Sequence, residues 1–137
     1  MFIGSKWYRF IPVTLVMGIL FYLSHQPGDS FELPDVVDID KLLHSLAYGC
    51  LAVTALFLIS REFYCARPVR TCFLVVAFCF FYGVSDEVHQ MFVPDRYSSV
   101  MDLVADTMGA VVAVILWAWL RRTGRMGFVS CKAQRLK

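Results

Sequence analysis

The residues best suited to catalysis or ligand binding lie at the end of the third of four apolar runs. Asp86, Glu87, His89 and Gln90 fall within five positions there. On a helix, Asp86 lies one turn from Gln90 and three residues from His89. Two adjacent carboxylates near a helix C-terminus oppose the helix dipole, and ionisable groups are costly within a membrane. They require a compensating cation, which Arg96, Lys41 or a bound metal could supply. Because ionisable groups are costly within a membrane, a functional site is favoured over structural ion pairing, which is the alternative.

A second polar group lies at the start of the second apolar run. Lys41, His44 and Tyr48 are spaced by three and four residues, so they share one face of a helix. Lys and Tyr are common at the head-group level of a membrane, and interfacial anchoring is the simpler interpretation. The alternative is that His44 joins the acids of the third run in proton transfer.

The fourth apolar run follows Ser99 and carries Asp102 and Asp106 on the same stripe. Ser99 and Asp102 are typical of a helix-capping pair, which is a sufficient role for both. Asp106 lies seven residues inside the helix, about 10 Å at 1.5 Å per residue, beyond the reach of capping. Small residues at Gly109 and Ala113 continue the stripe, so tight helix packing should point Asp106 into the bundle.

Three predicted helices thus present polar residues at one depth, which predicts a pocket there. Two of these helices begin at that depth, and their N-termini, together with Lys41 and Arg96, favour an anionic group such as phosphate or carboxylate. The candidates for proton transfer are Asp86, Glu87, His44 and His89. The candidates for substrate binding are Lys41, Tyr48, Gln90, Arg96, Asp102 and Asp106.

Metal binding is the competing use of the same histidines and carboxylates, which suit hard or borderline ions. No ligand spacing in the sequence is specific for a particular metal. We therefore expect neither a metal nor a cofactor.

Four apolar runs must position these residues, at about 7–24, 40–60, 69–90 and 99–120. A membrane helix needs about 20 apolar residues, so the runs predict one all-α domain, an integral-membrane four-helix bundle. A cleaved signal peptide is the alternative for the short first run, although residues 24–27 lack the small-x-small cleavage pattern. Residues 61–70 should form a short basic turn, and residues 121–137 a basic tail.

Charge alternates between the ends of the predicted helices. Eleven of the thirteen basic residues lie in the N-terminus, the second connection and the C-terminus, and ten of the eleven acids lie in or beside the other two connections. This positive-inside pattern predicts a multi-pass cell-membrane protein with both termini in the cytoplasm. The polar pocket would then open to the outer leaflet.

Composition excludes several classes of protein. The 137-residue chain is 58% hydrophobic with a mean hydropathy of +0.61, too apolar for an ordinary soluble domain. Nucleic acid is a poor partner, because the basic residues lie in short juxtamembrane segments that suit anionic lipid. A transporter is disfavoured, because no polar series continues through the third helix.

Several motifs together point to one family. They are Ser24, Asp40-Lys41-Leu42-Leu43-His44 with Tyr48, the run Ser85-Asp86-Glu87-Val88-His89-Gln90, and then Pro94, Arg96, Asp102 and Asp106-Thr107-Met108-Gly109-Ala110. The chain resembles the VanZ-like family of small bacterial membrane proteins from about residue 20 to residue 113, and the run that begins at Ser85 is the specific part. The family more often has Asn where this chain has Asp106. The resemblance therefore implies that Asp106 is a weaker catalytic candidate than Asp86 or Glu87.

The resemblance implies a role in the cell envelope, since the founding member is associated with low-level resistance to glycopeptide antibiotics, teicoplanin especially. It implies no settled biochemical activity. One hypothesis is an enzyme that acts on an anionic membrane lipid or lipid-linked envelope precursor. Another is a non-enzymatic binder of a lipid, an amphiphilic antibiotic or a partner membrane protein. A third is that the polar cluster only holds the helices together.

Overall fold

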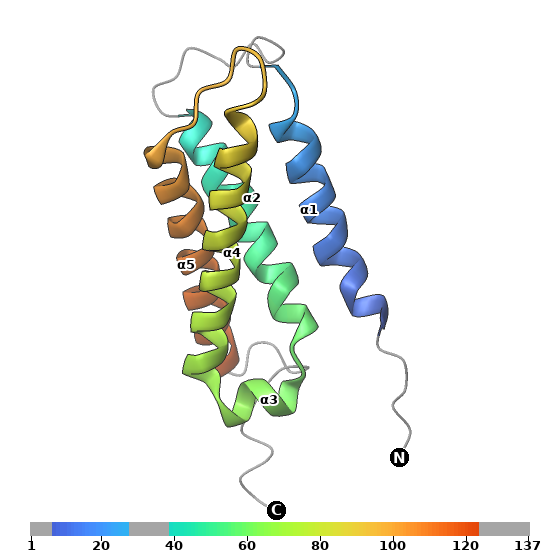
Figure 1. Cartoon of the computed structure of the whole chain (residues 1–137). Helices are drawn as coiled ribbons and strands as arrows, with labels where there is room; N and C mark the ends of the chain where they lie inside the picture. Colours follow the sequence, from blue (N-terminus) through green and yellow to red (C-terminus); the bar gives the residue numbers. More distant parts are fainter. Residues whose placement is uncertain (1–6, 28–38, 124–137) are drawn as a thin grey trace, which may run out of the picture.

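The computed structural model describes residues 7–27 and 39–123. Figure 1 shows a bundle of long helices with α1 at one edge and the short α3 across one end. The elements in chain order are η1 (Trp7–Arg9), α1 (Phe10–Ser24), α2 (Ile39–Leu58), α3 (Arg61–Ala66), α4 (Pro68–Gln90) and α5 (Val100–Thr123). The prediction of an all-α bundle of four long helices is confirmed.

The four long helices are apolar enough to cross a membrane. The candidate spans are Trp7–Ser24, Ile39–Leu58, Pro68–Gln90 and Val100–Thr123, with only 17% to 28% of each apolar window buried inside the protein. Phe73, Phe81 and Ile115 are 70%, 69% and 60% exposed. Helices that are apolar on every side, with most of that surface facing outward, are typical of a protein surrounded by hydrocarbon.

The closest packing lies between α2 and α5. A Cβ atom on Gly109 would overlap the main-chain carbonyl of Ser45, and a Cβ atom on Gly49 would lie 4.0 Å from the Cβ of Ala113. Ser45 and Gly49 on α2 therefore face Gly109 and Ala113 on α5. Such pairs of small residues, four apart, let membrane helices approach closely. This contact fixes the register of α2 against α5 near the polar end of the bundle.

Helix α1 is attached to the other helices mainly through α2. Val13 and Leu20 are its buried apolar side chains. A hydrogen bond adds α4, since the Tyr82 hydroxyl donates to the carbonyl of Met17 at 2.8 Å. Much of the surface of α1 faces outward, because only 17% of the first span is buried, the lowest fraction among the four spans.

The connection between α2 and α4 differs from the expected turn. Its residues form helix α3, because Ser60 accepts a hydrogen bond from the Phe63 N–H at 3.2 Å as an N-cap, and Pro68 suits the first turn of α4. The long helices begin and end within three residues of the expected bounds. Helix α5 continues to Thr123, so it takes in the start of the predicted basic tail, and residues 124–137 lie outside the described structure.

Candidate functional site

A cavity of about 520 Å³ lies at the end of the bundle where α2 and α5 begin and α1 and α4 finish. Its volume falls within the range of about 300–1,000 Å³ that is usual for small-molecule sites. Side chains from these four helices and from the loop between α4 and α5 line it. Six of the predicted site residues are among them: His44, Tyr48, Asp86, Gln90, Arg96 and Asp102.

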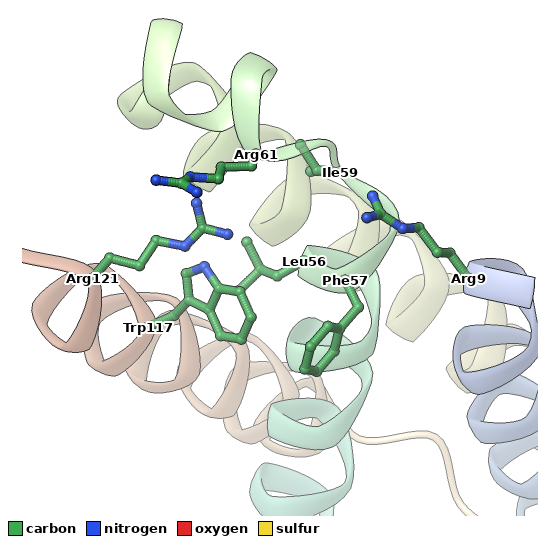
Figure 2. A pocket seen from close by; sticks show the side chains of 7 residues that line it. All are labelled: Arg9, Leu56, Phe57, Ile59, Arg61, Trp117 and Arg121. Carbon is green, nitrogen blue, oxygen red and sulfur yellow. The ribbon is translucent and has the colours of Figure 1, made fainter. Parts of the chain in front are cut away.

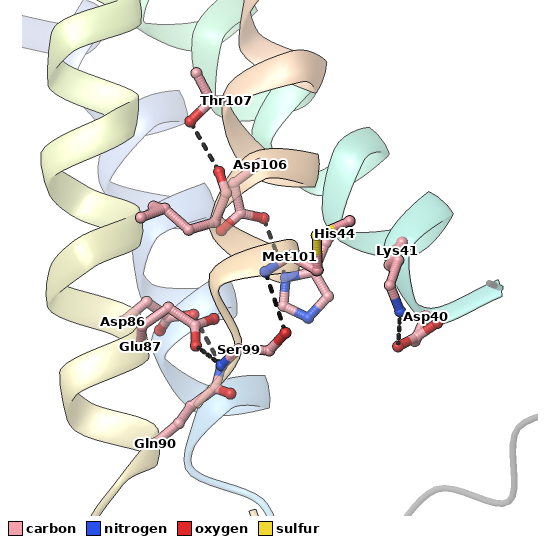
Figure 3. Close-up of polar contacts among 11 residues, drawn as sticks. Asp40, Lys41, His44, Asp86, Glu87, Gln90, Ser99, Met101, Asp106 and Thr107 are labelled. Atoms are coloured by element: carbon pink, nitrogen blue, oxygen red, sulfur yellow. Dashed lines mark hydrogen bonds and ion pairs between the residues drawn. The ribbon is translucent and has the colours of Figure 1, made fainter. Parts of the chain in front are cut away.

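His44 links this cavity to a buried carboxylate (Figure 3). Its Nδ1 lies 3.0 Å from Oδ1 of Asp106, and the two side chains are 22% and 0% exposed. When the carboxylate accepts the Nδ1–H, the neutral imidazole has an unprotonated Nε2. Figure 3 shows that this second nitrogen lies on the side of the ring away from Asp106. The pair thus has the arrangement of an oriented general base.

Small residues bring His44 and Asp106 together. His44 directly precedes Ser45, and Asp106 lies about one turn before Gly109, so the close contact of Ser45 with Gly109 sets both polar residues. Gly83 on α4 provides space for the carboxylate, because a Cβ atom there would lie 3.2 Å from Oδ2 of Asp106. The prediction that Asp106 points into the bundle is confirmed.

Several polar atoms of cavity-lining residues lack a hydrogen-bond partner. Asp86 has one, since its Oδ2 accepts a hydrogen bond from Nε2 of Gln90 at 3.2 Å. In contrast, Oγ of Ser24, Oη of Tyr48 and Oδ1 of Asp102 are buried without a hydrogen bond to any described residue. Buried polar atoms are normally paired. These three atoms are therefore placed to bind water or the polar part of a ligand.

The chain matches the model of one protein family over most of its length. The VanZ/LLP1 model covers residues 4–121, which include every residue that lines the cavity. The chain belongs to the VanZ/LLP1 family. No curated protein and no solved structure matches it. With its four apolar helices, it is a VanZ-like, multi-pass membrane protein.

Arg96 of this VanZ-like protein attaches α1 to the rim of the cavity. Its Nη2 donates to the carbonyl of Leu23 at 2.8 Å, and its Nε donates to the carbonyl of Gln26 at 3.1 Å. Cationic side chains commonly bind the free carbonyls at a helix C-terminus in this way. Asp95, which precedes it, has a φ of 57°, a left-handed conformation that Asp tolerates in turns. Arg96 lines the cavity, but two of its nitrogens are bonded to the end of α1.

The lining of the VanZ-like cavity is more acidic than the sequence suggested. Arg96 is the one Lys or Arg side chain among the described lining residues. Lys41 is outside the lining, and its Nζ lies 3.2 Å from Oδ2 of its neighbour Asp40. Four aspartates line the cavity: Asp40, Asp86, Asp95 and Asp102. Lys41 and Arg96 thus do not converge in this lining as the predicted anion site required.

Glu87 caps the first turn of α5 and is not part of the cavity lining. Its Oε2 accepts the N–H of Ser99 at 2.7 Å. A carboxylate at a helix N-terminus also interacts favourably with the helix dipole. The predicted reciprocal cap between Ser99 and Asp102 is therefore wrong. Oγ of Ser99 accepts the Met101 N–H at 3.2 Å, as a cap should. The N–H of Ser99, however, donates to Glu87 of α4 and not to Asp102.

His89 lies in a stack of rings outside the cavity lining. Its Nε2 is 3.2 Å from Nδ1 of His25, and its ring centroid lies 4.8 Å from that of Phe21 and 5.3 Å from that of His25. Phe21 is on α1 and His25 follows that helix directly. The stack therefore joins the ends of α1 and α4.

A shared metal site was the alternative use of the predicted acids and histidines. The structure separates them, because His44 and Asp86 line the cavity whereas Glu87 bonds to α5 and His89 contacts His25. Within residues 7–27 and 39–123, no group of three or more His, Cys, Asp or Glu side chains is arranged to hold a metal ion.

Proposed function

We propose that this VanZ-like protein acts on the polar head of a membrane lipid or lipid-linked envelope precursor, with His44 as the general base. The observation that carries the proposal is the 3.0 Å contact between His44, at the cavity wall, and the fully buried Asp106. A carboxylate inside a membrane bundle is costly and more often marks function than packing.

The chemistry that this pair supports is proton transfer. Nε2 of His44 accepts a proton from a hydroxyl group or water bound in the cavity, and Asp106 stabilises the resulting imidazolium through Nδ1. Such assistance is typically worth about 10²- to 10⁴-fold in rate. The unpaired atoms of Ser24, Tyr48 and Asp102 would hold the reacting group in reach.

The lining favours a head group that donates hydrogen bonds. Its four aspartates are acceptors, and Arg96 is already bonded to the carbonyls of Leu23 in α1 and of Gln26 just after it. A hydroxyl or ammonium group fits such a lining better than a bare anion, because like charges repel at short range. We therefore propose that the reacting part of the lipid carries a hydroxyl or an amine, even where the whole lipid is anionic.

The hydrocarbon part of the substrate has a path between α1 and α2. Leu20 and Leu23 of α1 and Leu43 and Ala47 of α2 line the same cavity. Leu23 and Leu43 are also 41% and 46% exposed, so this wall reaches the outward surface of the bundle. An acyl or prenyl chain can then remain in the membrane while the head group occupies the polar end.

We propose that the cavity faces the outer leaflet and that both termini are cytoplasmic, as the distribution of basic residues supports. A Tyr97→Cys variant, at a position 88% exposed on the cavity side, should react with an impermeant maleimide in intact cells. Arg67→Cys, exposed at the other end of the bundle, should react only after lysis. Labelling of position 67 alone in intact cells would mean that the cavity faces the cytoplasm.

The proposal is tested by mass spectrometry of total lipids and lipid-linked wall precursors. Cells would express the intact protein, His44→Asn, His25→Asn or no protein. We expect a lipid species that changes with the intact protein and with His25→Asn, because His25 is exposed and outside the cavity lining. His44→Asn should leave that species as it is in cells without the protein. The same change with His44→Asn would exclude His44 as the base.

The second candidate is a non-enzymatic binder of a lipid or of an amphiphilic antibiotic of the teicoplanin type. The observation that favours it is the apolar wall between α1 and α2, which can hold an acyl chain without any chemistry. This function predicts no altered lipid in the same experiment. It also predicts that purified protein retains a bound amphiphile equally well with and without His44→Asn.

A further inference from the structure

A second cavity, of about 50 Å³, lies at the opposite end of the protein (Figure 2). Three arginines from η1, α3 and α5 line it, together with Trp117 and apolar side chains from the end of α2. The arginines are Arg9, Arg61 and Arg121. One buried water needs about 10–15 Å³, so the cavity has room for a group larger than a single water.

Arg121 is the most deeply buried cation of this cavity. The residue is only 8% exposed, and its guanidinium carbon lies 3.9 Å from the ring centroid of Tyr64 and 5.1 Å from that of Trp117. The aromatic faces attract the cation but accept no conventional hydrogen bond. Nε and Nη1 of Arg121 and Nε1 of Trp117 are buried with no hydrogen-bond partner among the described residues.

These unpaired atoms are all donors, and the described residues that line the cavity offer them no carboxylate. The lining residues are three arginines, a tryptophan and apolar side chains. Burial raises the pKa of Tyr64 to about 12, so its phenol stays neutral. The buried guanidinium of Arg121 is costly without a partner, and the positive charges of Arg9 and Arg61 at the same cavity add repulsion.

We propose that this cavity binds a phosphate group, with Arg121 and Trp117 as buried donors and Arg9 and Arg61 as flanking charges. Guanidinium groups recognise phosphate oxygens through short, charge-assisted hydrogen bonds. In Figure 2 the guanidinium groups of Arg61 and Arg121 lie on the side of the Trp117 indole nitrogen, with Arg9 across the cavity from them. An anion between them is surrounded by positive charge from three elements.

Two sources offer this chemistry, the head group of an anionic phospholipid and a free phosphate ion. Phe57 lines the cavity and is 49% exposed, and Arg9 lies near the start of the first span. The cavity is therefore at the level of phospholipid head groups, where basic residues attract anionic lipid. It lies at the other end of the bundle from His44, so neither proposal depends on the other.

The test uses the full chain, purified in a neutral detergent, and measures its thermal unfolding. One arm compares potassium phosphate with chloride at equal ionic strength. The other compares phosphatidylglycerol with dioleoylglycerol, which has acyl chains but no phosphate. A ligand that binds the native state raises Tm, so we expect phosphatidylglycerol to raise it. A rise with inorganic phosphate as well would show that free phosphate is sufficient.

Arg121→Gln should lose this rise in Tm, whereas Arg122→Gln, an exposed neighbour outside the cavity lining, should keep it. Arg9→Gln is the second variant, because its partly exposed position makes it usable even if Arg121→Gln does not fold. It should weaken binding by about tenfold, the value of one charged hydrogen bond. Equal shifts in the intact protein and Arg9→Gln, equal shifts with both lipids, or no shift with either phosphate source would overturn the proposal.

Discussion

Gly109→Ala should lower the thermal unfolding temperature of the detergent-purified protein markedly. The added Cβ would overlap the main-chain carbonyl of Ser45, and a main-chain atom cannot move aside as a flexible side chain can. Overpacking a tight core typically costs about 1–3 kcal/mol. We expect the upper part of that range, because relief requires α2 and α5 to separate along their most extensive contact.

Gly18→Ala is the matched control for this substitution. It makes the same chemical change in another spanning helix, but a Cβ on Gly18 has nothing within 4 Å. Its Tm should stay the same or rise slightly, because Ala favours a helix more than Gly does. Equal Tm values for Gly109→Ala and Gly18→Ala would mean that the contact of Ser45 with Gly109 does not hold the bundle together.

Asp106→Ala should abolish the lipid change that the intact protein produces while lowering stability by only about 1 kcal/mol. Hydrogen bonds between membrane helices average about 0.6 kcal/mol and reach about 1.7 kcal/mol at most. His44 is also 22% exposed at the cavity, so water can replace its lost partner. The pair therefore contributes little to holding α2 against α5. Its main expected effect is on the orientation and protonation of His44.

Asp106→Asn separates positioning from mere packing. An Asn carbonyl oxygen can still accept the Nδ1–H of His44, so the imidazole keeps its orientation but loses the stabilising charge. We expect this variant to retain part of the lipid change that Asp106→Ala loses, with both measured by lipid mass spectrometry. If all three proteins alter lipids equally, Asp106 does not position His44. If Asp106→Ala fails to fold, the pair is a structural element after all.

The sequence was sufficient to predict the helices, because their signal is local. Long apolar runs separated by charged connections are typical of membrane spans and need no tertiary information. Helix α3 was missed, since six residues between two spans are too few for a periodic signal. The N-cap at Ser60 and the proline at position 68 were the available indications of it.

The site was predicted only in part. Helix periodicity shows which residues share a face of one helix, but not which residues of other helices they contact. The spacing of His44 and Tyr48, and of Asp86 and Gln90, correctly placed each pair on one wall of the cavity. Nothing local distinguishes Asp86, which faces the cavity, from its neighbour Glu87, which bonds to the start of α5.

Loop geometry accounts for other differences from the expected site. Asp95 lines the cavity from a left-handed turn that no periodicity describes. Arg96 was expected to bind an anion, but the same turn brings its guanidinium to the carbonyls at the end of α1. Such a contact between segments about seventy residues apart follows only from the packing of α1 against the loop.

The short span of α1 has a consequence for the surrounding bilayer. Together with η1 it forms a span of 18 residues, Trp7–Ser24, against 24 for α5, which extends about 27 Å at 1.5 Å per residue. A hydrocarbon core is about 30 Å thick, and a span that is too short draws the two leaflets closer around it. Since α1 forms one wall of the large cavity, the membrane should be thinnest beside that wall. Lipid head groups beside that wall would then lie nearer to His44 than they would in a bilayer of average thickness.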